Sequence, residues 1–198
     1  MSVLEFAFPA MSGIQIDNIA YDLIRKVQPD VLSTTSPFDV ERFVDVHLEG
    51  MTGIAPDYRD DLPSEIYEFT DTAENKLVIN AGLLDDTWGD NEKFFRSTVA
   101  HEVGHCLLHV PVLRRCKKDR IFTEGKKKDK VALYRKTEIP LYRNPEWQAW
   151  RFAGALLMPE QVVQSLISKG ASLQEMARHF KVNRVFIEQR MKALKIQI

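Results

Sequence analysis

The sequence has few of the features that mark secreted and membrane-spanning proteins. Only two cysteines, Cys106 and Cys116, occur in its 198 residues, which is too few for a disulfide framework and compatible with free thiols. No apolar run approaches the roughly 18 residues that a membrane span needs. The opening segment MSVLEFAFPAMSG lacks the basic start of a secretory signal. We therefore expect a cytoplasmic protein with no membrane partner.

A net charge of only −1 conceals an uneven charge distribution. Residues 37–92 carry fifteen acidic side chains against three basic ones, whereas residues 114–136 carry eleven basic side chains against three acidic ones. The basic segment fits a solvated loop, an active-site lid, or a contact for an acidic partner or nucleic acid. The sequence leaves these interpretations open.

The order of the predicted elements indicates an α+β fold. Apolar spacing predicts helices within residues 14–50, the second with Ser36 as N-cap and Pro37 as its first residue. Two β-prone runs, 65–70 and 76–80, flank a polar turn and predict an antiparallel hairpin. We expect a further strand at residues 131–135. The hydrophobic content of 44% is enough for one packed core.

Three helical segments are predicted after the hairpin. One begins at Asp90 or Asn91 and ends near residue 110, because Pro111 stops it. The next begins at an Asn144 N-cap, and the tail from residue 159 forms short helices. We predict a domain of residues 1–158, with N-terminal helices at 14–50 and a core at 60–158. A C-terminal helical subdomain, 159–198, would follow.

Three of the five histidines lie within nine residues, in the segment VAHEVGHCLLHVP. His101 and His105 are one helical turn apart, so both rings can reach one metal ion. Glu102 lies about 100° around the helix from His101, where its carboxylate can accept a proton from water without being a ligand. This spacing is typical of zinc metallopeptidases, although a helix with a histidine-rich polar face is the competing interpretation.

A zinc site of this kind needs a third protein ligand. His109 lies another turn along the same helix, roughly 6 Å farther by helical rise, and one straight helix cannot wrap three such ligands around an ion. Glu146, in the first turn of the later helix, is the better candidate, since Ala149 and Ala153 permit close packing. Helix-dipole stabilisation is the alternative role for an acid there.

The two motifs together resemble the ImmA/IrrE family of metallo-endopeptidases. HEVGHCLLH is followed about forty residues later by YRNPEWQAWRFAGALLMP, and the family's second motif is matched at several positions: Glu146, Ala149, Phe152, Ala153, Leu156, Leu157, Met158 and Pro159. The resemblance implies a compact zincin-like fold, with a small antiparallel sheet on helices that include the metal-binding one. It also implies one zinc ion on His101, His105 and Glu146, with Glu102 as general base.

The resemblance further implies that the substrate is a helix-turn-helix transcriptional repressor, cleaved in trans to derepress stress-response or mobile-element genes. One position departs from the family pattern, because Trp150 stands where relatives have Asn or Asp. The indole N–H cannot accept the hydrogen bond that would orient a ligating histidine, so we expect weakened metal binding or a substitute acceptor. Tyr142, Arg143 and His109 remain candidates to stabilise the oxyanion.

The rival function class is a DNA- or protein-binding regulator with a structural or vestigial metal site. Residues 172–195 resemble a helix-turn-helix, in which Lys181 occupies a position where glycine is common. In this interpretation nucleic acid contacts residues 114–136 or the helix 184–192, through Arg184, Gln189, Arg190 and Lys192. Two amphipathic helices packed on the catalytic lobe explain the same spacing.

Overall fold

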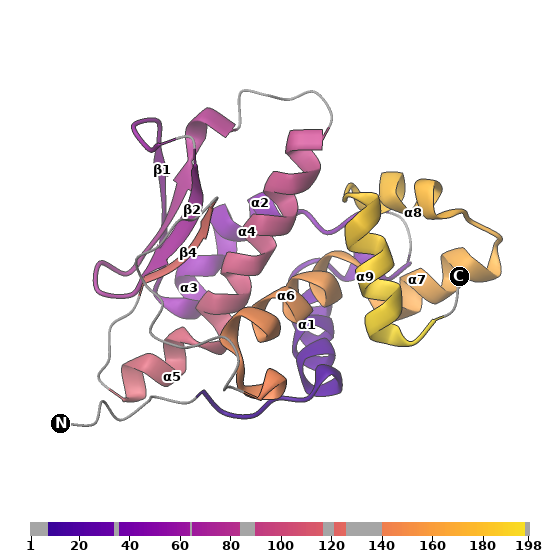
Figure 1. Cartoon of the computed structure of the whole chain (residues 1–198), viewed down its shortest axis with the longest axis horizontal. Helices are drawn as coiled ribbons and strands as arrows, with labels where there is room; N and C mark the ends of the chain where they lie inside the picture. Colours follow the sequence, from indigo (N-terminus) through magenta and orange to yellow (C-terminus); the bar gives the residue numbers. More distant parts are fainter. Residues whose placement is uncertain are drawn as a thin grey trace.

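In the computed structural model, the chain has a small sheet on one side of a long central helix and further helices on the other (Figure 1). The structure describes the following ranges: 8–33, 36–63, 65–83, 90–116, 121–125 and 140–196. The predicted α+β class is confirmed. In the described part of the chain, no helix has both the length and the apolar character that a bilayer crossing requires.

The N-terminal helices form much as their apolar spacing predicts. Helix α1, Gly13–Val27, begins with a capping box in which Ser12 and Gln15 satisfy each other's backbone N–H groups. A second helical stretch runs through α2 (Val40–Phe43), a π-helical segment η2 (Val44–Leu48) and α3 (Glu49–Thr52). Its N-cap is Asp39, whose side chain accepts the Arg42 N–H, so the predicted cap at Ser36 was wrong.

The sheet has the strand order β1-β3-β2-β4. Strands β2 (Ile66–Asp71) and β3 (Lys76–Asn80) form the predicted antiparallel hairpin. Strand β4 (Ile121–Gly125) also runs antiparallel to β2, whereas β1 (Ala55–Arg59) pairs in parallel with β3. The sheet is therefore mixed and not wholly antiparallel as predicted. The strand expected at 131–135 lies outside the described residues.

Helix α4, Asp90–Leu108, contains the His-Glu-x-x-His segment and contacts both β2 and α6 (Pro145–Leu157). It stops as predicted, since a separate helix α5 (Val110–Arg115) begins next to Pro111. Gly104 permits the close crossing of α4 and α6, because a Cβ there would lie 3.1 Å from the Ala149 Cα and carbonyl oxygen. The tight packing fixes the distance between the histidines and the first turn of α6.

The C-terminal helices α7 (Glu160–Ser168), α8 (Leu173–Phe180) and α9 (Arg184–Leu194) lie on the far side of α6 from the sheet (Figure 1). Their buried apolar side chains, including Val162, Met176 and Ile187, belong to the same core cluster as those of α1, α4 and α6. The division into 1–158 and 159–198 stays a prediction.

Candidate metal centre

Two histidines of α4 and one glutamate of α6 converge at the crossing of these helices. Glu146 Oε2 lies 3.4 Å from His101 Nε2 and 3.6 Å from His105 Nε2. A tetrahedral zinc site with bonds of about 2.0–2.1 Å has ligand-to-ligand edges of about 3.4 Å. The oxygen of Glu146 is thus as far from each of the two nitrogens as one ligand of a small cation is from another.

The burial of the three side chains differs in a way that suits a site open on one side. Both histidine side chains are fully buried, while the side chain of Glu146 is half exposed. Asn144 orients the start of α6, because its side-chain oxygen accepts the backbone N–H groups of Glu146 and Trp147. The histidines are held by the core, and solvent reaches the site along the carboxylate.

Glu102 points from α4 toward the sheet. Its Oε2 accepts a 2.6 Å hydrogen bond from the hydroxyl of Thr70 on β2, and its Oε1 lies 3.4 Å from His101 Nδ1. Thr70 also lies 3.6 Å from the sulfur of Cys106. His101, Glu102 and His105 form a cluster of buried groups whose donor atoms all lie within 4.8 Å of one another. The carboxylate of Glu102 therefore lies beside the candidate ligands, and the hydroxyl of Thr70 on the sheet holds it in place.

Burial and the two nearby carboxylates have opposite effects on the pKa of His101. Burial lowers its pKa, but hydrogen bonding and charge from Glu102 and Glu146 outweigh burial and raise the pKa from 6.5 to about 10. For Glu146, burial raises the pKa, and the neighbouring His105 and His101 hold it well below its ordinary value. Without a metal, a proton on His101 compensates the negative charge. A divalent cation would supply the same compensation, so this donor set fits a metal.

His109 contacts the candidate ligand His105 and does not lie at the surface. It is buried, with Nδ1 2.9 Å from His105 Nδ1 and Nε2 2.9 Å from Gln148 Oε1. Since both ring nitrogens are engaged, His109 has no N–H left to stabilise an oxyanion. Arg143 and Tyr142 were the other two candidates to stabilise the oxyanion. Arg143 donates to the Phe8 carbonyl, and the Tyr142 side chain is exposed.

Trp150 interacts with the site through its ring face. The indole stacks on His101, with ring centroids 4.4 Å apart and an interplanar angle of 28°. Phe186 of α9 packs against the indole edge to face, at 5.8 Å. Trp150 thus restrains the plane of the His101 ring by contact, at the position where the family pattern has an Asn or Asp that could accept a hydrogen bond.

Sequence reasoning missed two contributors, Thr70 and Gln148. A threonine on a β-strand is common, and nothing in the local pattern distinguishes Thr70 from its neighbours. Gln148 lies two residues after Glu146, a spacing that gives no signal of contact with His109, the N-cap of α5. Both contacts depend on how α4 packs against other elements.

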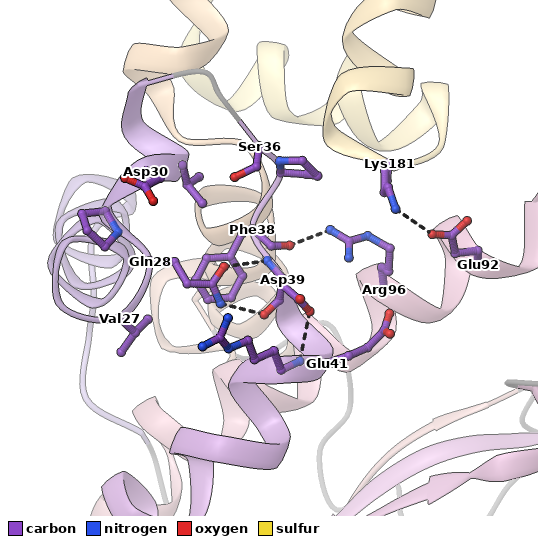
Figure 2. Close-up of a pocket in the computed structure, with 14 residues that line it drawn as sticks. Val27, Gln28, Asp30, Ser36, Phe38, Asp39, Glu41, Glu92, Arg96 and Lys181 are labelled. Carbon is purple, nitrogen blue, oxygen red and sulfur yellow. Dashed lines mark hydrogen bonds and ion pairs between the residues drawn. The ribbon is translucent and has the colours of Figure 1, made fainter.

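A separate cavity of about 650 Å³ lies near the start of α4 (Figure 2). Arg96 donates to the Phe38 carbonyl at 2.7 Å, Lys181 pairs with Glu92 at 3.3 Å, and Gln28 exchanges two hydrogen bonds with the Asp39 backbone. These contacts join α1, α2, α4 and the turn after α8. Its described lining residues include none of the candidate ligands, so the cavity is distinct from the histidine site.

An α+β fold with a His-Glu-x-x-His helix and a carboxylate nearby on a second helix is the arrangement expected of a metallopeptidase. Residues 90–192 match the family model of the IrrE N-terminal-like domain, Peptidase_M78. The match covers more than half of the chain, and the chain belongs to this family of IrrE/ImmA-type metallopeptidases. Comparisons with curated proteins and with solved structures gave no match.

Proposed function

We propose that the protein is a zinc-dependent endopeptidase whose ion is held by His101, His105 and Glu146. The observation that carries this proposal is the convergence of Glu146 Oε2 on both Nε2 atoms, at 3.4 and 3.6 Å. Two imidazoles and a carboxylate form a ligand set that zinc accepts with one position left for water or substrate. When bound, zinc would polarise the scissile carbonyl and acidify a water.

The role of Glu102 is to accept and return a proton. Its Oε2 is held by the Thr70 hydroxyl, so Oε1 is the oxygen that lies on the side of His101. From there it can take a proton from the attacking water and deliver it to the leaving amine. Trp150, stacked on His101, shields one face of the site from solvent. The Glu146 side, which is half exposed, is where substrate enters.

The substrate we propose is another protein chain, a helix-turn-helix transcriptional repressor whose cleavage derepresses stress-response or mobile-element genes. Membership of the family supports a protein substrate. The acidic stretch 37–92 and the basic stretch 114–136 offer charge complementarity to such a partner.

The test compares wild type with Glu102→Gln, both loaded with one equivalent of zinc, on a repressor encoded beside this protein. The amide keeps the shape but accepts no proton, so cleavage should fall by ~10²–10⁴-fold while zinc stays bound. Mass spectrometry of the fragments gives the cleaved bond. Equal cleavage by both proteins would exclude Glu102 as the base, and no cleavage by zinc-loaded wild type would count against this substrate.

A second function class, a regulator that binds nucleic acid or protein, has one structural observation in its favour. Lys181 ends α8 in the left-handed conformation, with φ 52° and ψ 51°, which suits the glycine that is common in the turn of a helix-turn-helix. Arg190, however, is buried and bonded to Asp17 and the Met158 carbonyl, so the predicted nucleic-acid face loses that residue. Steep salt-dependent binding to random duplex without proteolysis would favour this class.

A further inference from the structure

A chain of buried hydrogen bonds leads from the backbone to the candidate ligand His105. His105 Nδ1 faces His109 Nδ1 at 2.9 Å, and His109 Nε2 faces Gln148 Oε1 at 2.9 Å. Gln148 Nε2 then donates to the carbonyls of Pro9 and Tyr142, at 2.9 and 2.8 Å. The proposed hydrolysis makes no direct use of His109 or Gln148, yet both are almost fully buried.

The backbone carbonyls at the end of this hydrogen-bonded series determine which atom is the donor in each of its hydrogen bonds. Two carbonyl oxygens can only accept, so the end of Gln148 that faces Pro9 and Tyr142 must be the NH₂ group. Its carbonyl oxygen therefore faces His109. Tyr142 O is itself held in place, because it also accepts the Met11 N–H at 2.9 Å. The orientation of the amide follows from its partners.

The orientation of Gln148 in turn determines which ring nitrogen of His109 carries a proton. Since Gln148 Oε1 can only accept, His109 Nε2 must carry the proton, and a neutral imidazole has none left for Nδ1. The surroundings favour the neutral ring: His109 is buried, and Phe8 packs edge to face against it at a centroid distance of 4.8 Å. His109 Nδ1 is therefore an acceptor directed at His105.

We propose that Gln148 and His109 are positioning residues that hold His105 as the Nδ1–H tautomer, with the Nε2 lone pair directed at the metal. This inference rests on the proposed metal site, because Nε2 is the atom that lies 3.6 Å from Glu146 Oε2. An imidazole that donates from one nitrogen to a fixed acceptor is a better ligand through the other. The N-terminal segment takes part, since Pro9 accepts from Gln148.

The two histidines of α4 are then oriented by different means. His101 Nδ1 faces a carboxylate, Glu102 Oε1, at 3.4 Å, and the ring is stacked on Trp150. His105 Nδ1 faces the neutral ring of His109. The role of that ring as acceptor follows from Gln148 and the backbone carbonyls to which Gln148 donates. Loss of His109 should therefore weaken metal binding through His105 and leave the surroundings of His101 unchanged.

Zinc affinity, measured by chelator competition, tests the proposal on two variants of one residue. His109→Leu removes the acceptor and should weaken affinity by ~10 to 100-fold, the usual cost of losing an outer partner of a ligating histidine. His109→Asn supplies a side-chain oxygen near the same place and should recover most of that loss. His47→Asn, on the separate segment η2, is the matched control and should match wild type. Equal affinity of His109→Leu and wild type would overturn the proposal.

The tautomers themselves can be read in the metal-free wild-type protein, which avoids any loss of folding in the variants. Long-range ¹H–¹⁵N correlation of ¹⁵N-labelled histidines should show a proton on Nε2 of His109 and on Nδ1 of His105. A proton on Nδ1 of His109 would overturn the proposal even if zinc binds tightly. Conversely, if Glu146→Ala leaves zinc affinity unchanged, the proposed ligand set fails whatever the tautomers are, so the two failures are distinguishable.

Discussion

The two faces of helix α4 carry different chemistry. Toward the sheet, Glu102 is held by a neutral hydroxyl, that of Thr70, with the thiol of Cys106 nearby. Toward α6, His101 and His105 face the charged carboxylate of Glu146, half exposed to solvent. The α6 face has the donor atoms that a cation would need, and the sheet face holds one carboxylate in place.

This difference follows from the helical period. Positions 102 and 106 lie on one side of α4, and positions 101 and 105 lie on another. On the sheet side the neutral hydroxyl of Thr70 orients Glu102, while on the α6 side the carboxylate of Glu146 adds a type of ligand that a metal cation accepts. Metal binding and proton transfer should therefore respond to different substitutions.

The largest expected effect is on the α6 face. Glu146→Ala removes a proposed ligand, so zinc affinity should fall by more than the ~10 to 100-fold that the loss of an outer partner costs. Chelator competition measures the fall. Glu160→Ala is the control, because Glu160 is also a first-turn acid, on α7. If both variants bind zinc like wild type, Glu146 is not a ligand, and the two faces of α4 do not differ in the way described.

Gly104→Ala should damage the α6 face by moving a whole helix. The added Cβ would lie 3.1 Å from the Ala149 Cα and carbonyl, so α6 must shift and carry Glu146 away from the histidines. We expect a stability loss of about 1–3 kcal/mol and a clear loss of zinc affinity. Urea unfolding and chelator competition measure the two effects.

Gly50→Ala is the matched control for this crossing. Gly50 lies in α3, and its added Cβ would meet no described atom within 4 Å. The substitution should stabilise the protein by about 0.5–1 kcal/mol, because alanine is the better helix former. Unchanged zinc affinity in Gly104→Ala would show that the site tolerates a displaced α6, contrary to the spacing argument.

Thr70→Val tests the sheet face alone. The isosteric side chain cannot donate to Glu102 Oε2, so the base loses its orienting bond. Cleavage should fall about 10-fold, a part of the ~10²–10⁴ that a positioned base contributes, with zinc affinity unchanged. Thr70→Ser keeps the hydroxyl and should retain most activity. Loss of zinc affinity in Thr70→Val would show that the two faces are not separable.

Much of this architecture could be predicted because its signals are local. The spacing of His101, Glu102 and His105 needs only a helix, and the Asn144 cap with Pro145 places Glu146 in a first turn. The hairpin of β2 and β3 follows from alternating β-prone residues around a polar turn. The resemblance of the two motifs to the ImmA/IrrE family then predicted that the two helices meet at one site.

The remainder depends on packing that no single segment encodes. The parallel pairing of β1 with β3 joins residues separated by the whole of β2, and APDYR lacks a strong strand pattern. Thr70 and Gln148 act only because α4 lies against β2 on one side and α6 on the other. Arg190 looked like a surface cation, yet burial beside Asp17 makes it part of the core.

The smallest predicted effect is the release of a proton from His101 when zinc binds. In the metal-free protein, the pKa of His101 is raised from 6.5 to about 10 by Glu102 and Glu146 acting against burial, so the ring is protonated at pH 7. A metal ligand must be deprotonated, so zinc binding at pH 7 should release about one proton per ion from His101. Calorimetry in buffers of different ionisation enthalpy measures that release.

The same raised pKa sets the pH dependence of the metal-free protein. A group whose pKa is higher in the folded than in the unfolded state stabilises the fold fully below its unfolded value, near 6.5, and that contribution is lost as pH rises toward about 10. Unfolding free energy should therefore fall across this window, and zinc affinity should rise across it. His101→Gln should flatten the stability profile. A wild-type profile that is equally flat, with no proton released by zinc, would show that the carboxylates on the two sides of His101 do not act on it together.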